Sequence, residues 1–145
     1  APIKADFSWF RKDFNGMSQH LLIAKKKYTS QADMSQANLV KWRDELVSKI
    51  EGGSKGSYMK SNTVDLPVYE YAYQLNGSYT KELRGIREME NAFMGGAFFN
   101  YTLLDAKRNE LIMIDAFVFA PGKEKRDYMQ QLDHIAKTAR IAATN

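Results

Sequence analysis

The chain has 145 residues, a formal net charge of +4, 44% hydrophobic residues and no cysteine. A chain of this length forms one hydrophobic core, and its apolar and aromatic content excludes a disordered protein. The lack of cysteine excludes disulfide bonds, a cysteine nucleophile and thiolate metal sites. We expect a single α+β domain over residues 1–145. Because the chain starts at Ala1 without an initiator methionine, we interpret it as part of a longer parent protein.

The first third of the sequence predicts an aromatic segment, a buried strand and a helix. Aromatic residues are concentrated in residues 7–14, a turn follows at 15–16, and the apolar run at 20–24 is typical of a buried strand. Ser35 is placed to cap a helix, and the glycines at 52–53 are placed to end it. The apolar stripe of this helix recurs at i, i+3, i+7 and i+11: Leu39, Trp42, Leu46 and Ile50.

From residue 58 onward the pattern changes to the alternation that is typical of strands. Asn76-Gly77 is the strongest hairpin signal in the chain. Residues 78–90 are therefore expected to return as one long strand, bent or bulged near Gly85. The strand before the turn has one aromatic face, which consists of Tyr69, Tyr71 and Tyr73.

The remainder of the chain predicts two further strands and a second helix. We expect a turn at residues 93–96, a strand at 97–104 and a turn at 105–109. Residues 110–120 are apolar at nearly every position, so we place this strand in the middle of the sheet. A helix follows Pro121-Gly122. Its apolar stripe consists of Tyr128, Leu132, Ile135 and Ala139.

These elements define the expected fold class. Each helix has one apolar stripe, and that stripe must be buried against another layer. The connections between the strands are short turns, which favours antiparallel pairing. We therefore predict a two-layer α+β sandwich, in which a mainly antiparallel sheet of about five strands carries both helices on one face.

Asp115 is the conspicuous residue of the central strand, because it is an acid in an otherwise apolar run. A buried carboxylate is costly unless it meets a cation or a hydrogen-bond donor. Arg84 and Arg87, on the long strand beside Gly85, are the expected partners. We favour a structural role for Asp115, either in a buried ion pair or as an acid at a strand edge, over an anchoring or catalytic carboxylate near a pocket.

The sequence offers two candidate groups of catalytic residues. The first would combine Asp115 with acids of the long strand as the paired carboxylates of a glycosidase; these acids are Glu82, Glu88 and Glu90. The second would be a hydrolase or ligand-processing site that uses Asp115 with Arg84 and Glu88. Acids two residues apart are common on any solvated strand. We therefore predict that the domain is not an enzyme and keep the hydrolase as the alternative.

His20 and His134 are the two histidines of the sequence. They are far apart in the chain, and no Gly-x-Ser-x-Gly motif provides a nucleophilic serine. We interpret His20 as a strand-boundary residue and His134 as a residue of a helix surface. With no cysteine present, we expect neither a metal site nor a cofactor.

The aromatic strands predict a binding surface. Sheets that stack bases on aromatic side chains bind RNA, and such a face could contain Tyr69, Tyr71, Tyr73, Phe99 and Tyr101. The RNA-recognition signature is absent, so we expect no nucleic-acid partner and keep single-stranded nucleic-acid binding as a weaker alternative. An aromatic face that the helices leave open suits a peptide, a glycan or a protein. The candidate binding residues are Tyr69, Tyr71, Tyr101, Arg84, Glu88 and Asp115.

Two neighbouring stretches resemble a known family. Residues 83–91, LRGIREMEN, and residues 94–98, MGGAF, resemble a signature of Bacteroidota cell-envelope lipoproteins that carry only a domain-of-unknown-function label. Members of that family typically read leucine-arginine-glycine-leucine-tryptophan and then methionine-glycine-glycine-proline-phenylalanine. This chain departs from the pattern at Ile86-Arg87 and at Ala97. Further similar stretches are Arg43-Asp44, residues 56–59 and residues 115–126.

The resemblance spans residues 36–143 and corresponds to the C-terminal half of such a lipoprotein. It implies an exported protein, located in the periplasm or anchored to the outer membrane. Its membrane contact would be a lipid-bearing cysteine upstream of Ala1, outside this chain. The resemblance implies no functional residues. Together with the aromatic strands, it predicts a non-enzymatic domain that binds or scaffolds a protein or glycan component of the cell envelope.

Overall fold

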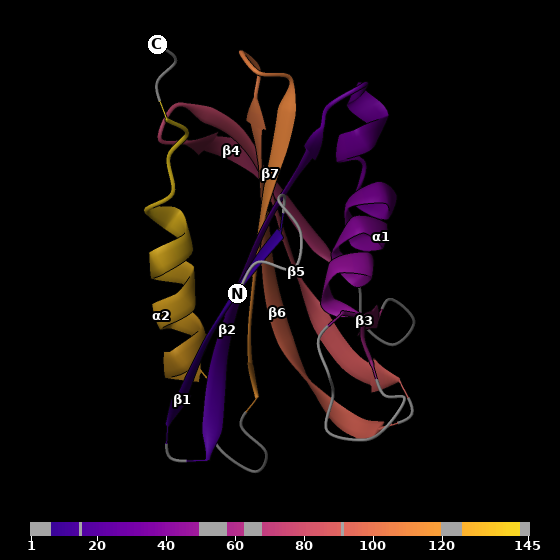
Figure 1. Cartoon of the computed structure of the whole chain (residues 1–145), viewed down its shortest axis with the longest axis vertical. Coiled ribbons are helices and arrows are strands. Elements are labelled where there is room, and N and C mark those ends of the chain that lie inside the picture. Colours follow the sequence, from indigo (N-terminus) through magenta and orange to yellow (C-terminus); the bar gives the residue numbers. More distant parts are fainter. Residues whose placement is uncertain are drawn as a thin grey trace.

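The computed structural model describes residues 7–14, 16–49, 58–62, 68–90, 92–119 and 126–142. In this part of the chain an antiparallel sheet lies between two α-helices, one on each face (Figure 1). The strands are β1 (Phe7–Phe14), β2 (Met17–Lys27), β3 (Tyr58–Asn62), β4 (Tyr69–Leu75), β5 (Ser78–Glu90), β6 (Ala92–Asp105) and β7 (Glu110–Phe119). The helices are the short 3-10 helix η1 (Gln31–Met34), α1 (Gln36–Val47) and α2 (Arg126–Lys137).

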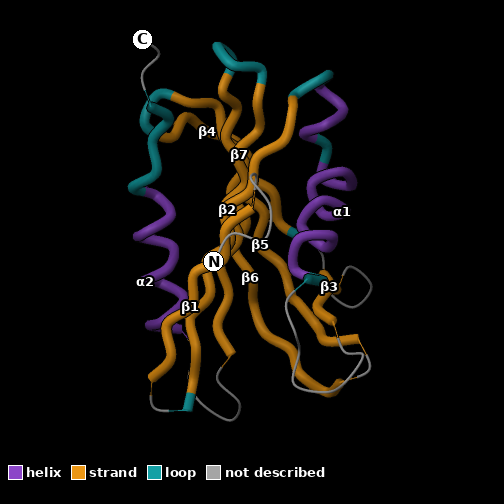
Figure 2. The backbone as a smooth tube through the Cα atoms, in the orientation of Figure 1, coloured by secondary structure: helices purple, strands orange, loops and turns teal. Residues whose placement is uncertain are grey.

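The strand order is β1-β2-β7-β6-β5-β3, and β4 also pairs with β5. β4 runs along residues 78–84 of β5, and β3 runs along residues 86–90. Because β6 pairs with β5 over the same stretch, β3 and β4 share the opposite edge of β5. The strands converge in the middle of the view and splay apart below it, as expected for a twisted sheet (Figure 2).

The predicted α+β class, with an antiparallel sheet and two helices, is confirmed. The described residues contain seven strands rather than about five. The prediction that both helices pack on one face is wrong. β7 lies between β2 and β6, as predicted for the central strand, and sends Met113 and Phe117 towards α1 but Ala116 and Val118 towards α2. Because both faces of this strand are apolar, each face needs a helix to exclude water.

α1 begins where the sequence predicts. The Ser35 Oγ accepts a hydrogen bond from the backbone N–H of Asn38 at 3.2 Å, so Ser35 is the N-cap. The helix ends at Val47. The sequence predicts that this helix continues to Ile50 and ends at the glycines at 52–53. These residues lie outside the described ranges.

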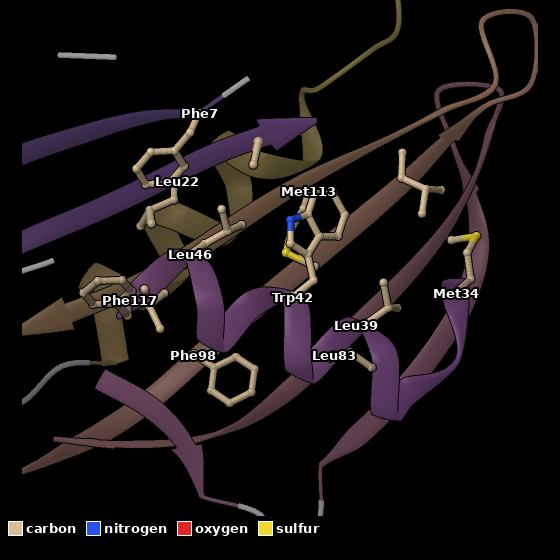
Figure 3. Packing of buried hydrophobic residues seen from close by; sticks show 13 residues of the cluster. Phe7, Leu22, Met34, Leu39, Trp42, Leu46, Leu83, Phe98, Met113 and Phe117 are labelled. Carbon is tan, nitrogen blue, oxygen red and sulfur yellow. The ribbon is translucent and has the colours of Figure 1, made fainter. Parts of the chain in front are cut away.

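The helix α1 packs its apolar stripe onto the sheet and forms the larger core. Figure 3 shows this core, in which helix and strand side chains interdigitate. Close packing of this kind removes apolar surface from water, at roughly 25 cal/mol per Å². The labelled residues are Phe7, Leu22, Met34, Leu39, Trp42, Leu46, Leu83, Phe98, Met113 and Phe117.

The hairpin predicted at Asn76-Gly77 is confirmed, because both residues have positive φ angles (50° and 88°), as in a type I′ turn. β5 then runs over the predicted residues 78–90. The irregularity of its register lies between residues 88 and 89, not at Gly85. Gly85 has a different role: a Cβ there would lie 2.7 Å from the ring of Phe98, so only glycine lets this ring cross the strand.

The turn predicted at residues 93–96 is wrong, because these residues belong to β6. Gly95 and Gly96 pair with residues 88 and 87 of β5, next to the shift in register. Pairing along the whole length of β5 outweighs the local turn preference of two glycines, and glycine is common beside such irregularities. The turn predicted at 105–109 connects β6 to β7 as expected. Pro121-Gly122 lies outside the described residues.

The helix α2 is rotated relative to the predicted stripe. Leu132 is buried as predicted, but Ile135 is 52% exposed, and the other buried positions are Met129 and Ala136. The rotation turns Asp133 towards β5, where it binds Arg84. No helix in the described part of the chain is long and apolar enough to cross a lipid bilayer.

Candidate binding surface

Side chains of β4 and β5 form a surface on the α2 side of the sheet. Tyr71 lies opposite Glu82, which in turn lies opposite Tyr101 on β6. Tyr101 belongs to the apolar cluster under α2. Tyr69 and Tyr73 are two residues away from Tyr71 on the same strand, so they share its face. We call Tyr69, Tyr71 and Tyr73 the tyrosine strip.

Arg84 lies at the centre of an ionic network next to the tyrosine strip. Its Nε donates to Glu82 Oε2, and its Nη2 donates to Asp133 Oδ1 of α2 at 3.2 Å. Its guanidinium group stacks on the ring of Phe99, with 4.0 Å between Cζ and the ring centroid. Because Asp133 belongs to α2, this network attaches the helix to β5.

Two tyrosine hydroxyls and one lysine complete the network. The hydroxyl of Tyr73 donates to Glu82 Oε1 at 2.7 Å, and that of Tyr101 donates to Asp133 Oδ1. Lys137 Nζ lies 3.3 Å from Asp133 Oδ2. Burial, together with the hydrogen bonds to these carboxylates, raises the pKa of Tyr73 and of Tyr101 above the ordinary value. Both tyrosines therefore stay protonated at neutral pH and act as hydrogen-bond donors, not as bases.

Exposure divides this surface into an accessible part and a supporting part. Tyr69 is 59% exposed and Tyr71 is 50% exposed, while Arg84 is half-buried. Tyr101 is fully buried, so it supports the network and offers nothing to a partner. The structure thus brings together these four of the six predicted binding residues. Asp133 was not predicted from the sequence as part of this surface. The feature that could have indicated it is its position directly after Leu132, a residue of the apolar stripe of α2.

Asp115 lies on the other side of the sheet, under α1. Arg43 donates through Nε to Asp115 Oδ2 at 2.8 Å and through Nη2 to Oδ1 at 3.2 Å. Asn100 Nδ2 donates to Oδ2 at 2.8 Å, and all three side chains are fully buried. The Arg43 guanidinium also lies over the ring of Phe98 at 3.9 Å. The predicted ion pair is present, but its cation is Arg43, because Arg84 points to the α2 side.

The predicted partner was wrong because strand order decides which cation reaches Asp115. The residue that reaches it, Arg43, follows Trp42 and lies four residues after Leu39, on the core face of α1. An arginine in the apolar stripe of a helix and an aspartate in an apolar strand each need a buried partner of opposite charge. Together, these two features of the sequence point to this ion pair. The other predicted cation, Arg87, has its side chain outside the described residues.

The environment of Asp115 is that of a structural group. Burial raises the pKa of this carboxyl, and the charge and hydrogen bonds of Arg43 act against that rise, as does the amide of Asn100. Asp115 and Arg84 lie on opposite sides of the sheet, so they do not converge on one site as the hydrolase alternative requires. The third member of that set, Glu88, has its side chain outside the described residues.

His20 lies in a buried aromatic stack and not at a strand boundary. Its ring stacks on Trp9 and Phe117, with centroid distances of 5.7 and 4.7 Å. Its Nδ1 accepts from Trp9 Nε1 at 3.0 Å, and its Nε2 lies 2.7 Å from Ser18 Oγ. An indole N–H only donates, so in neutral His20 the proton is on Nε2 and is donated to Ser18. A nucleophilic serine needs the reverse arrangement, in which the histidine accepts.

His134, by contrast, is exposed on α2, as expected for a helix surface. Within the ranges that the structure describes, no group of three or more His, Asp or Glu side chains is arranged to hold a metal ion. The carboxylates and guanidinium groups of the two ionic networks are paired with one another. What the surface offers to a partner is therefore its exposed tyrosine rings beside the half-buried Arg84.

The fold and this surface together define a class of protein: an α+β domain whose antiparallel sheet lies between two helices and presents tyrosines along one edge. The chain belongs to the family described as Domain of unknown function (DUF4837), whose model matches residues 2–138. The expectation of an uncharacterised domain family is thereby confirmed. The match begins well before residue 36, where the predicted resemblance starts. Among curated proteins, no sequence matches this chain.

Proposed function

We propose that this chain is a non-enzymatic domain of a cell-envelope lipoprotein, and that it binds a protein component of the envelope through the tyrosine strip. The observation that carries the proposal is the exposure of Tyr69 and Tyr71 beside the half-buried Arg84. Tyrosine and arginine are enriched among the residues that contribute most to protein–protein affinity. The envelope location rests on the sequence resemblance to envelope lipoproteins.

The network behind the tyrosine strip supports a role in binding. Glu82 and Asp133 hold the Arg84 side chain from two directions, and its ring contact with Phe99 fixes the guanidinium plane. A side chain that is already ordered loses less conformational entropy when a partner binds. Tyrosine offers a large contact area with few rotatable bonds, which has the same effect.

The hydrolase alternative has less support. It combines Asp115 with Arg84, and these residues lie on opposite sides of the sheet. The tyrosines of the strip, in turn, are hydrogen-bond donors or exposed rings, and neither arrangement supplies a general base. Binding is the role for which the exposed groups are suited.

A pull-down from native membranes tests the proposal, with the 145-residue chain as immobilised bait. The variants are Tyr69→Ala/Tyr71→Ala and, as a matched control, Tyr79→Ala. Tyr79 is an exposed tyrosine of β5, and its position in the alternation places it on the α1 side. We expect a protein that the wild type and the control retain and that the double variant loses.

Two outcomes of this pull-down would contradict the proposal. Equal retention by all three baits would show that the tyrosine strip is not the binding surface. Retention of carbohydrate without protein would show that the partner is a glycan. Location is tested separately on the parent protein, which should be found in the envelope fraction and should incorporate a labelled fatty acid. An unlabelled parent in the cytoplasmic fraction would contradict the lipoprotein part of the proposal.

A further inference from the structure

The strand that carries the tyrosine strip lies at an edge of the sheet. Within the described residues, β4 pairs with β5 and with no other strand. Along most of its length β4 is exposed on both faces, since Tyr69, Glu70, Tyr71 and Ala72 are all exposed. The backbone groups on the outer side of such a strand lack a partner strand, and they form a template for another extended chain.

The hairpin register identifies these outer groups. Leu75 and Ser78 flank the two-residue turn, so they form a hydrogen-bonded pair. Hydrogen-bonded and non-hydrogen-bonded positions alternate along an antiparallel pair. Residues 69, 71 and 73 therefore bond to β5. The residues between them, Glu70, Ala72 and Gln74, direct their N–H and C=O groups away from β5.

The two edges of the sheet differ in how they discourage pairing. At the β1 edge, Arg11, Lys12 and Asp13 are all exposed, with Arg11 and Asp13 paired at 2.7 Å, and charged side chains on an edge strand oppose the addition of another strand. β4 has the sequence YEYAYQL, without lysine, arginine or proline. Its single charged residue, Glu70, pairs with Lys81 at 3.3 Å. The β4 edge therefore carries one charged side chain where the β1 edge carries three in a row, and it is the less protected of the two.

We infer that the partner adds an extended segment of its own polypeptide to the outer edge of β4. This inference rests on the proposed function and specifies that the partner binds at the same site as an extended segment. A polypeptide in the extended conformation supplies donors and acceptors at the spacing of Glu70, Ala72 and Gln74, which a glycan cannot do. Its alternate side chains lie beside the tyrosine strip, where aromatic or β-branched residues pack best against tyrosine.

The test uses a random heptapeptide display library as the probe and the 145-residue chain as the target. The best selected peptide is synthesised, and its affinity is measured by fluorescence polarisation. Ala72→Pro removes one outward N–H without removing a bond to β5, and an edge strand tolerates proline at such a position. Ala72→Val is the matched control. We expect Ala72→Pro to weaken binding about tenfold and Ala72→Val to leave it within about twofold.

A second measurement leaves the protein unchanged. The same peptide is N-methylated at each position in turn, and we expect affinity to fall at alternate positions only, because a strand directs every second N–H towards its neighbour. Equal loss at all positions, or none, would overturn strand addition. Dimerisation of the purified chain that Ala72→Pro abolishes would also overturn it, because the occupant would then be a second copy.

The two proposals fail in different ways. If Ala72→Pro and N-methylation have no effect while Tyr69→Ala/Tyr71→Ala abolishes binding, strand addition is wrong and the tyrosine strip remains the binding surface. If neither set of changes affects binding, both proposals are wrong. The melting temperature of Ala72→Pro, measured beside that of Ala72→Val, shows that any loss of binding occurs in a folded protein.

Discussion

At the scale of single residues, the pair Arg43 and Asp115 shows how a buried charge is accommodated. Both oxygens of Asp115 accept hydrogen bonds from Arg43, and Asn100 donates a third. An intact pair of this kind contributes little net stability, because desolvation offsets the attraction. Removing one partner destabilises the fold strongly, since the other charge stays buried and unpaired.

Asp115→Ala is therefore expected to lower the free energy of unfolding by about 3–5 kcal/mol. Urea unfolding followed by circular dichroism measures the change. The matched control is Asp13→Ala, which breaks an exposed ion pair with Arg11 and should cost less than about 1 kcal/mol. Replacing both partners, as in Arg43→Met/Asp115→Leu, should cost less than Asp115→Ala alone. Unchanged unfolding of Asp115→Ala would refute the structural role of the pair.

At the scale of elements, one turn and one helix depend on particular carboxylates. In the turn between β6 and β7, the buried Asp105 accepts from the backbone N–H of Arg108 at 3.2 Å and from its Nη1 at 2.7 Å. Burial alone would raise the pKa of Asp105, but the hydrogen bonds from Arg108 outweigh it, and the pKa lies below the ordinary value.

This shift predicts a pH dependence of stability. Because the pKa of Asp105 is lower in the folded state, its carboxylate stabilises the fold above the unfolded pKa of about 3.9. That contribution is lost as the pH falls through the folded pKa. Asp105→Asn should therefore cost about 1–2 kcal/mol at pH 7 and progressively less at acidic pH. Urea unfolding over a pH series tests this, and a difference that is constant with pH would contradict it.

α2 depends on Asp133, which connects the helix to Arg84 and Tyr101 of the sheet. Asp133→Asn should lower the free energy of unfolding by about 1–2 kcal/mol. It should also increase hydrogen exchange of the amides of α2 more than that of the amides of α1. His134→Ala is the control, because His134 is the exposed neighbour of Asp133. Equal exchange in Asp133→Asn and His134→Ala would mean that the apolar contacts alone hold the helix.

At the scale of the whole molecule, the two cores share the central strand. β7 contributes Met113 and Phe117 to the core under α1, and Ala116 and Val118 to the core under α2. Because β7 packs into both cores, it cannot move out of one core without disturbing the packing of the other. The two cores are therefore coupled. Unfolding is therefore expected to be a single cooperative transition.

Truncations on either side of the sheet test this coupling. Leu39→Ala removes packing under α1 and Leu132→Ala removes packing under α2, and each should cost about 2–5 kcal/mol. Both should shift one thermal transition to lower temperature in a calorimetric scan. Two separate transitions in Leu132→Ala would show that α2 unfolds independently of the sheet.

Signals that act over a few residues allowed much of the fold to be predicted. Ser35 caps α1, Asn76-Gly77 forms the hairpin, and residues 78–90 form one strand, because caps, turns and strand alternation are decided by neighbours in the chain. The failure at residues 93–96 has the converse cause. There, pairing with the long strand β5 keeps two glycines of β6 in a strand. Local preferences do not describe such pairing between strands.

The sequence by itself determined that the domain is α+β, that β7 is central, and that Asp115 needs a partner wherever it is buried. Only the tertiary structure decided that this partner is Arg43, 72 residues away, and that the helices lie on opposite faces. It also decided that Tyr69 and Tyr71 are exposed while Tyr101 is buried. The physical reason is that alternation places side chains on a face, whereas the order of the strands and the position of α2 decide what covers that face.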